Sequence, residues 1–367
     1  MATERSSPYL AVPASARWRE SVAGRSPESI NPHAGPSFLL GPEDRIASAG
    51  SCFAQRISES LRARGYNYLI TEQGPPFVGD EAKRELGYGV YSARYGNIYT
   101  VLQLVQLFQR AFGRFEPDEP VWTNSEGRFV DPFRPGVQPG GFTSESECLW
   151  DRSSHLKATR RVFEEADVLI FTLGLTESWV SAVDGAVFPV CPGAGLGGQF
   201  DAQRHLFHNF TLTEVVEHLE TFLGLLAEVN PKARVILTVS PVPLIATFEP
   251  RHVLQSTVYS KSVLRVACEE IIRRHDHVHY FASYEIVTAT GDSRRYFQED
   301  RRDVADEAVA HVIDCFGQQF LGGEEAPIVP QRAPAIAAGP DRGGKPLCDE
   351  DEILKAMADL AESSTPA

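Results

Sequence analysis

Short runs of apolar residues alternate along the chain with longer segments in which apolar residues recur every three or four positions. The short runs are typical of buried strands, and the helical spacing is typical of amphipathic helices. Thr211 and Glu214 also fit a capping box, which marks a helix start. Strands are predicted at residues 45–50, 168–173, 234–240 and 277–281. Helices are predicted at residues 52–61, 100–112, 211–228, 258–274 and 304–320, and a further helix is predicted to end at residue 165.

This alternation predicts a mostly parallel sheet with helices on both faces, a three-layer α/β/α sandwich. In such sheets the ligand site lies beyond the carboxyl ends of the strands. Three segments therefore hold the candidate chemistry, because each follows a predicted strand: residues 50–52, 174–177 and 240–243.

The rest of the chain is less regular. Two long inserts, 113–154 and 181–210, are rich in Gly and Pro and are expected to be irregular covers or binding loops. The predicted organisation is an irregular leader at 1–43, one α/β domain at 44–321, a Pro/Ala/Gly linker at 322–348 and an acidic helical tail at 349–367.

Charge and composition exclude several classes of protein. Among 367 residues, 35 Lys and Arg against 49 Asp and Glu give a formal net charge of −14, which argues against a nucleic-acid partner. The sequence has no stretch of 18 consecutive apolar residues, so no membrane span is expected. The polar start of the chain predicts a cytoplasmic protein. Six cysteines without a CxxC pair predict neither a disulfide scaffold nor a zinc site, and no metal or cofactor is expected.

Cys52 is the candidate nucleophile, because it stands at a turn between a predicted strand and a predicted helix. A helix N-terminus favours the reactive thiolate, and its unpaired N–H groups stabilise an oxyanion during acyl transfer. The alternative is that Gly50 and Ser51 form a turn and a helix cap, and that Cys52 is a small buried filler. The spacing alone leaves both interpretations open.

Five separated segments stand in a fixed order along the chain: Gly-Ser-Cys-Phe-Ala within 49–54, the strand and Gly before Trp179, Thr-Val-Ser-Pro-Val at 238–242, Tyr-Ser-Lys at 259–261 and Tyr-Phe-Ala-Ser-Tyr-Glu-Ile at 280–286. Together they resemble the GSCFA family, which is related to the SGNH/GDSL acyl-esterases. The resemblance covers roughly residues 45–320 and implies an SGNH/flavodoxin-like fold and an acyl-ester or thioester hydrolase or acyltransferase. It further implies an acyl-enzyme on Cys52, with Ser51 as the alternative nucleophile, and the Cys52 N–H as an oxyanion donor.

The resemblance also suggests binding residues. Gly96 and Asn97 fit the second SGNH block, although a helix-capping turn explains them equally well. The third block normally supplies an Asn that this chain lacks; Gly174, Thr176 and Glu177 stand there instead. Two cations are further candidates: Lys261 for a substrate anion or a solvated helix face, and Arg134 for an anion clamp or an ion pair with Asp131.

The last SGNH block, Asp-x-x-His, is incomplete. Asp300 matches its Asp, but Asp303 stands where the His should be. A thiol needs less activation than a hydroxyl, so this departure weakens Ser51 more than Cys52. His252 is the first substitute for the base, followed by His155, His205 and His208, and the chain also allows that none of them serves.

Two functions therefore remain. The first is the acyl-transfer enzyme, with an acylated small-molecule, carrier-bound or carbohydrate substrate. The second is a catalytically silent SGNH-like module that binds carbohydrate or acyl groups through Trp179, Tyr95, Tyr99 and the inserts. The sequence leaves open the choice between hydrolysis and transfer, and the oligomeric state.

Overall fold

The computed structural model describes residues 8–33, 38–289 and 293–321. The chain divides into two compact units, one of residues 41–281 and one of residues 1–40 with 282–325. The single domain expected at 44–321 is thus distributed over both. The linker expected at 322–348 and the helical tail expected at 349–367 lie outside the described residues.

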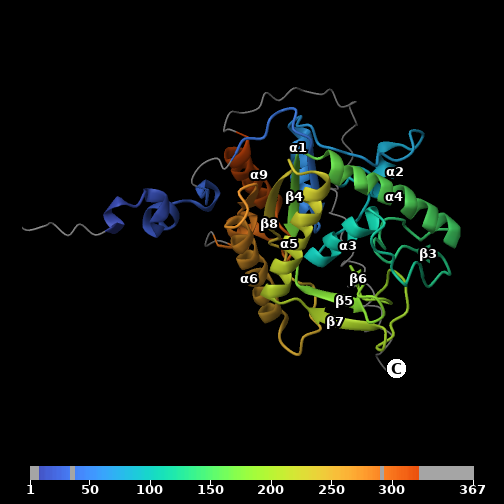
Figure 1. The fold of residues 1–367 in the computed structure, drawn as a ribbon. Coiled ribbons are helices and arrows are strands. Elements are labelled where there is room, and N and C mark those ends of the chain that lie inside the picture. Colours follow the sequence, from blue (N-terminus) through green and yellow to red (C-terminus); the bar gives the residue numbers. More distant parts are fainter. Residues whose placement is uncertain (1–7, 34–37, 290–292, 322–367) are drawn as a thin grey trace, which may run out of the picture. The chain divides into compact units, whose positions relative to one another are not determined.

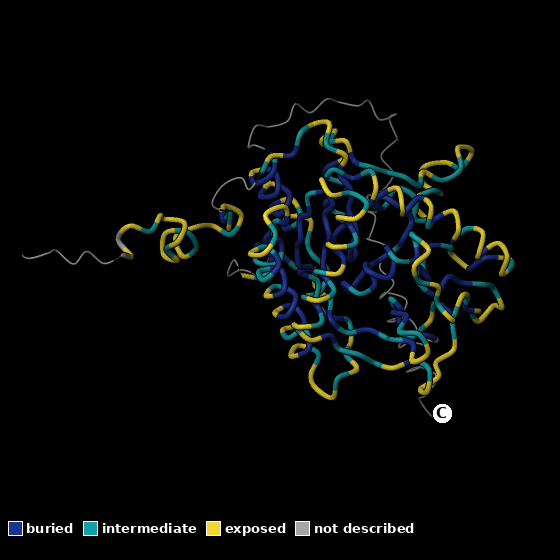
Figure 2. The backbone as a smooth tube through the Cα atoms, viewed as in Figure 1, coloured by how far each residue is buried: buried dark blue, intermediate teal, exposed yellow. Residues whose placement is uncertain are grey.

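A parallel sheet forms the centre of the larger unit. Its strands are almost entirely buried, which explains why they read as continuous apolar runs. Figure 2 shows this buried backbone in dark blue. In the described residues the order is β1-β4-β8-β9, with β1 (Ile46–Gly50), β4 (Val168–Leu173), β8 (Arg234–Val239) and β9 (Val278–Phe281).

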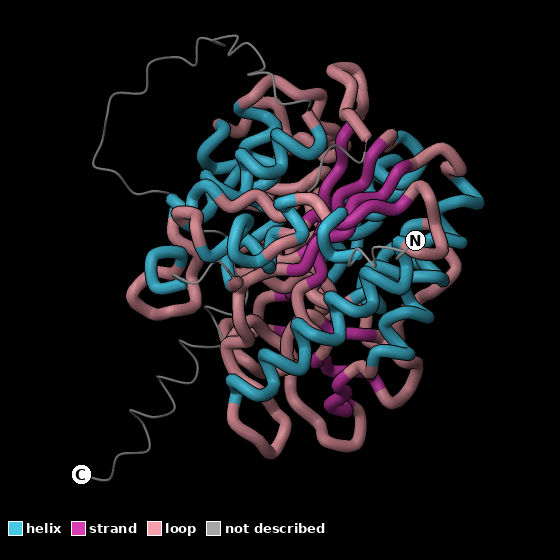
Figure 3. Tube along the Cα trace, turned by 90° about the vertical axis from the view of Figure 1, so that its left-hand side faces the viewer, coloured by secondary structure: helices cyan, strands magenta, loops and turns pink. Residues whose placement is uncertain are grey.

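Helices cover both faces of this sheet. The strands advance in one direction from β1 to β9, so right-handed connections place the helices before β4, β8 and β9 on one face. After α1 (Phe53–Ala63) the chain forms a parallel bridge from Tyr68 to Ile46, on the side of β1 that faces away from β4. This connection runs in the opposite direction along the sheet, so the same handedness places α1 on the other face. The predicted three-layer fold is confirmed, and Figure 3 shows the strands running between helices. The helices of the first face are α3 (Val101–Ala111), α4 (Glu145–Glu165), α5 (Leu212–Val229) and α6 (Val253–Ile272).

The helix starts follow capping chemistry. The predicted box at Thr211 and Glu214 is confirmed, and Thr100 with Gln103 forms a second one at α3. Ser144 caps α4, which therefore begins inside the segment expected to be an irregular insert. The short α2 (Asp80–Glu85) was not predicted.

The two inserts are partly regular, which corrects the expectation of irregular loops. They share a buried apolar cluster that includes Trp122, Val130 and Phe188. Their strands are β2 (Trp122–Thr123) and β3 (Phe129–Val130), which form a hairpin, and β6 (Val187–Phe188) and β7 (His205–Asn209), which flank β5 (Glu177–Ser181) in an antiparallel sheet. Figure 1 shows β5, β6 and β7 together.

The smaller unit is helical in its described part. The Leu40 N–H donates to the Phe320 carbonyl at 2.7 Å, and the Tyr296 hydroxyl lies 2.8 Å from His311 Nδ1. In its described part, the segment expected to be an irregular leader contains short helical turns. The helix predicted at 304–320 is confirmed. The elements are η1 (Pro8–Ala11), η2 (Ala14–Ala16), η3 (Arg19–Ala23), η4 (Pro27–Ser29), α7 (Ser283–Thr288), α8 (Ser293–Tyr296) and α9 (Asp306–Phe320).

Candidate active site

The turn after β1 places Ser51 and Cys52 at the carboxyl edge of the sheet and at the start of α1. Gly50 has φ 138°, and a Cβ on it would lie 2.4 Å from the Thr172 carbonyl oxygen of β4. Only glycine fits so close to the neighbouring strand. The Ser51 N–H donates to that same oxygen at 3.3 Å, which holds the turn against β4.

A small pocket of about 10 Å³ lies at this edge. It brings together the ends of three strands and one residue of α6, and the three segments singled out in the sequence meet there. A cavity this size has room for about one water molecule, so all its lining groups lie close to one point. They are Ser51, Cys52, Tyr99, Gly174, Leu175, Ser240, Val242, Pro243, Leu244 and Lys261.

The two candidate nucleophiles differ in exposure. Cys52 is 7% exposed and makes no side-chain hydrogen bond at the cap of α1. The Ser51 hydroxyl is fully buried and has no hydrogen-bond partner among the described residues. No histidine lines this pocket in the described part of the chain.

Two kinds of main-chain donor lie near the pocket. The Gly174 and Leu175 N–H groups both donate to the Tyr99 carbonyl oxygen, at 2.9 and 3.1 Å, so the main-chain donor of the candidate Gly174 is already engaged. The N–H groups of Cys52 and Phe53 open α1, and helix starts leave such groups without intrahelical acceptors. Cys52 itself lines the pocket, so the start of α1 lies at its wall.

Thr176 and Glu177 hold loops together and do not line the pocket. The Thr176 hydroxyl donates to Asn209 Oδ1 at 2.7 Å, so it does not serve as the expected oxyanion donor. Glu177 accepts hydrogen bonds from the Thr247 hydroxyl at 2.6 Å and the Phe248 N–H at 3.3 Å. Burial raises the pKa of Glu177.

Lys261 is the cation of the site. It is 2% exposed, and its Nζ donates to the Gly174 carbonyl at 2.6 Å. The interpretation of Lys261 as a solvated helix face is wrong. The structure instead places a buried ammonium beside Ser51 and Cys52.

Asn97 approaches the turn through Tyr91. The Tyr91 hydroxyl lies 3.0 Å from the Ser51 carbonyl oxygen and 2.8 Å from Asn97 Oδ1, and Gln55 Nε2 donates to it at 3.2 Å. Gln55, Tyr91, Gly96 and Asn97 all line a second pocket of about 480 Å³. That volume suits a small organic ligand. The sequence had given no role to Gln55 or Tyr91.

The residues proposed as base and orienting acid are engaged in local hydrogen bonds. His252 is exposed and caps α6, where its Nδ1 accepts the Leu254 N–H at 3.1 Å. Asp300 belongs to the smaller unit, and its Oδ1 accepts the N–H groups of Arg302 and Asp303 at 2.9 and 3.0 Å. The His252 side chain does not line the pocket around Cys52.

The other candidate histidines and Arg134 are engaged in ion pairs or hydrogen bonds. His155 Nδ1 lies 2.8 Å from Glu72, and His208 Nε2 lies 2.7 Å from Glu214. Arg134 pairs with Asp131 at 2.8 Å, so the ion pair expected as the alternative to an anion clamp is present.

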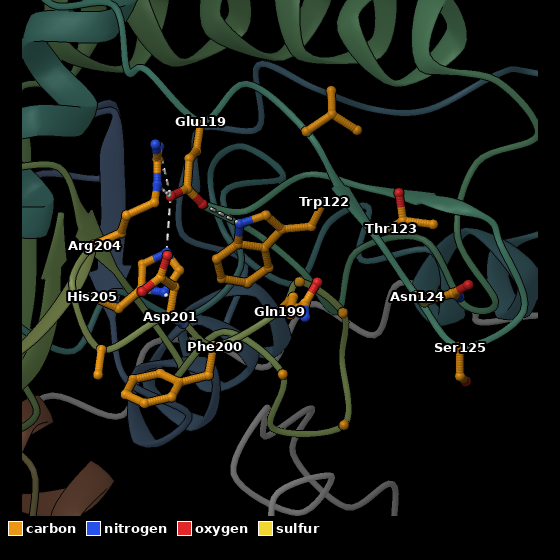
Figure 4. Close-up of a pocket in the computed structure, with 16 residues that line it drawn as sticks. Glu119, Trp122, Thr123, Asn124, Ser125, Gln199, Phe200, Asp201, Arg204 and His205 are labelled. Atoms are coloured by element: carbon orange, nitrogen blue, oxygen red, sulfur yellow. Dashed lines mark hydrogen bonds and ion pairs between the residues drawn. The ribbon is translucent and has the colours of Figure 1, made fainter. Parts of the chain in front are cut away.

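A broad groove of about 1100 Å³ runs between the two inserts (Figure 4). Glu119 organises it, because its carboxylate accepts from Trp122 Nε1 at 2.9 Å and lies 2.9 Å from His205 Nε2 and 3.3 Å from Arg204. Phe200, which is 45% exposed, adds an apolar surface. The groove therefore offers both aromatic and hydrogen-bonding groups.

The described residues contain no group of three His, Cys, Asp or Glu side chains placed to hold a metal ion. Within the same residues, no helix is both long enough and apolar enough to cross a membrane.

Comparisons with known proteins identify the family. A comparison with curated proteins finds no match. Among solved structures, the chain is similar to a carbohydrate esterase family 3 from Talaromyces cellulolyticus, with 9% identity, a TM-score of 0.35 and coverage of 75% of this chain and 94% of that chain. At this low sequence identity, the similarity gives no information about the site. The GSCFA family model, in contrast, matches residues 45–316, which is well over half of the sequence, and the chain belongs to the GSCFA family.

Proposed function

We propose that this chain is an acyl-ester or thioester hydrolase or acyltransferase that works through an acyl group on Cys52. One observation carries the proposal. A single small pocket at the carboxyl edge of the sheet joins the Cys52 thiol, the start of α1 and the buried ammonium of Lys261. A thiolate is the reactive form of cysteine, and both a helix start and a nearby cation favour an anion.

The reaction proceeds in two steps. The thiol of Cys52 first loses its proton to water, and the thiolate forms a C–S bond to the acyl carbonyl carbon. The oxyanion accepts hydrogen bonds from the N–H groups of Cys52 and Phe53. Its collapse breaks the bond to the leaving alkoxide or thiolate, which takes a proton from water. Water or an acceptor hydroxyl then attacks the acyl-Cys52 thioester and releases the free thiol.

Lys261 takes the electrostatic part that an imidazolium would play. Its ammonium stabilises the negative charge that develops as the thiol attacks, and a thiol depends less on a base than the Ser51 hydroxyl does. The cytoplasm, which keeps thiols reduced, is the compartment that suits this chemistry. The substrates that fit the proposal are acylated small molecules, acyl groups on a carrier and acylated carbohydrates.

The pocket must open for substrate, because about 10 Å³ does not admit an acyl carbonyl. The segment from Val242 to Leu244 forms one wall and lies outside any helix or strand. We assign the opening to this segment. The pocket of about 480 Å³ beyond Gln55 and Tyr91 then holds the remainder of the substrate.

The test is turnover of p-nitrophenyl acyl esters and acyl thioesters by the full chain, with intact-mass detection of the acyl adduct. Cys52→Ala is expected to abolish both turnover and adduct. Cys191→Ala is the control, because that half-buried thiol has a pKa raised by burial to about 11 and is expected to be unreactive. Adduct formation that survives in Cys52→Ala and disappears in Ser51→Ala would assign the nucleophile to Ser51.

The second candidate function is a silent binding module. It is favoured by the pocket around Cys52, which no histidine lines among the described residues, and by the groove of about 1100 Å³. In this case Phe200→Ala weakens oligosaccharide binding measured by calorimetry, while no variant shows turnover that depends on Cys52. Any such turnover would reject the silent module.

A further inference from the structure

Arg110 is a buried cation with unused hydrogen-bond donors. It lies near the end of α3 and is only 8% exposed. Its guanidinium stands 4.0 Å from the centre of the Phe133 ring and makes no side-chain hydrogen bond or ion pair within the described residues. A guanidinium has five N–H donors, and burying them without acceptors is costly.

The Arg110 side chain faces a cavity of about 20 Å³. Asn97, Gln103 and Gln106 also line this cavity, but their amide oxygens already accept hydrogen bonds from elsewhere. Gln106 Oε1 accepts the Val187 N–H at 2.8 Å, and Gln103 Oε1 accepts the Thr100 N–H at 2.9 Å. Asn97 Oδ1 lies 2.8 Å from the Tyr91 hydroxyl. All three amide oxygens are thus engaged by other donors, and none of them accepts a hydrogen bond from Arg110 in the described part of the chain.

The ion-pair network near Arg110 has an excess of positive charge. Asp131 pairs with Arg134 at 2.8 Å and with Arg152 at 3.0 Å, and Asp151 pairs with Arg94 and Arg134. Glu72 is the third carboxylate, and its partner His155 has a pKa lowered by burial, which keeps that imidazole neutral at pH 7.

Four guanidiniums, Arg110 included, thus stand against three carboxylates. Asp131 attracts Arg110 but is already bound by two other arginines. A single negative charge in the cavity would balance the network and supply the acceptor that Arg110 lacks.

We propose that this cavity binds one monatomic anion of the size of chloride, held by the N–H groups of Arg110. About 20 Å³ exceeds the space that one water molecule needs, which is roughly 10–15 Å³, and it is too small for sulfate, phosphate or a carboxylate group. The anion stabilises the packing of the first insert against α3. This site does not depend on the proposed chemistry at Cys52.

The first experiment measures urea unfolding of the full chain while sodium chloride replaces sodium gluconate at constant ionic strength. A ligand that binds only the folded protein divides the unfolding equilibrium constant by 1 + [L]/Kd. We expect a decrease of about tenfold for each tenfold rise in chloride above Kd. Arg110→Met removes this dependence. Arg114→Met is the matched control, because Arg114 is partly exposed, pairs with Glu228 at 2.7 Å and should leave the dependence unchanged.

The second experiment needs no variant. Crystals of the unchanged protein are soaked in sodium bromide, and an anomalous peak is expected within hydrogen-bond distance of the Arg110 guanidinium. A wild-type protein whose stability ignores chloride, or crystals without that peak, would show that the cavity holds only water and would overturn the proposal. Sulfate stabilises folded proteins in general through exclusion from their surface. Only a sulfate effect that Arg110→Met removes would overturn the size argument and with it the monatomic anion.

Discussion

Gly50→Ala tests the turn on which the whole candidate site depends. The substitution forces a side chain into a backbone with φ 138°, and its Cβ would lie 2.4 Å from the Thr172 carbonyl oxygen and 2.8 Å from Thr172 Cβ. Positive φ costs an L-residue about 1–2 kcal/mol, and overpacking of a dense core costs about 1–3 kcal/mol. Together they lower the free energy of unfolding by about 2–5 kcal/mol.

Gly65→Ala separates these two costs. Gly65 also has positive φ, 77°, just beyond α1, but a Cβ there meets nothing within 4 Å. Its substitution should therefore cost only the backbone part, about 1–2 kcal/mol. Urea unfolding followed by circular dichroism measures both variants, with equal m-values as the check on two-state behaviour. Equal losses of stability in the two variants would refute the close contact between Gly50 and Thr172.

Three further predictions concern other parts of the larger unit. Asp131→Asn should lower the free energy of unfolding in urea by about 3–5 kcal/mol, because it leaves buried guanidiniums uncompensated, whereas Asp167→Asn at the exposed Arg45 pair should cost no more than about 1 kcal/mol. Burial acts to raise the pKa of Glu72, but the neighbouring His155 and Arg134 outweigh it and hold that pKa at about 2. The carboxylate therefore stabilises the folded state at any pH above its ordinary pKa of 4.5, and this stabilisation is lost as the pH falls toward 2. Stability of the unchanged protein should therefore fall between pH 4 and 3 about 1 kcal/mol per pH unit more steeply than that of Glu72→Gln, and equal slopes would contradict this. Thr211→Ala removes the cap of α5 and should lower Tm by an amount equivalent to about 1 kcal/mol, while a change at the exposed Thr221 should not.

The pattern of apolar residues predicted most of the fold because most elements bury apolar faces. The strands at 168–173 and 234–239 and the helix from Leu212 match the apolar pattern almost residue for residue. The first half of α4 was missed for a physical reason. It buries Arg152 and His155 against Asp131 and Glu72, so its inward face is polar and gives no apolar period. A polar interior of this kind cannot be recognised from hydrophobic spacing.

The candidate site was predictable in its location and not in its contacts. Parallel strands bring their carboxyl ends to one edge, so the meeting of Cys52, Gly174 and Ser240 follows from topology. The position of Lys261 does not, because its acceptor is the carbonyl oxygen of Gly174, a main-chain atom that every residue has. His252 illustrates the converse. It stands close to the site along the chain, but its ring caps its own helix.

The histidine that is missing at position 303 and the buried Lys261 both bear on which residue, Ser51 or Cys52, is the nucleophile. A serine nucleophile needs a partner that removes its proton during attack, and the Ser51 hydroxyl has no such partner in the described residues. A cysteine needs only that its anion be favoured beforehand, which a helix start and an ammonium achieve without accepting a proton. The residues proposed for this chemistry, Cys52, Phe53 and Lys261, all belong to the unit of residues 41–281. The Asp303 that stands in place of the expected histidine therefore weakens Ser51 more than Cys52 as the proposed nucleophile.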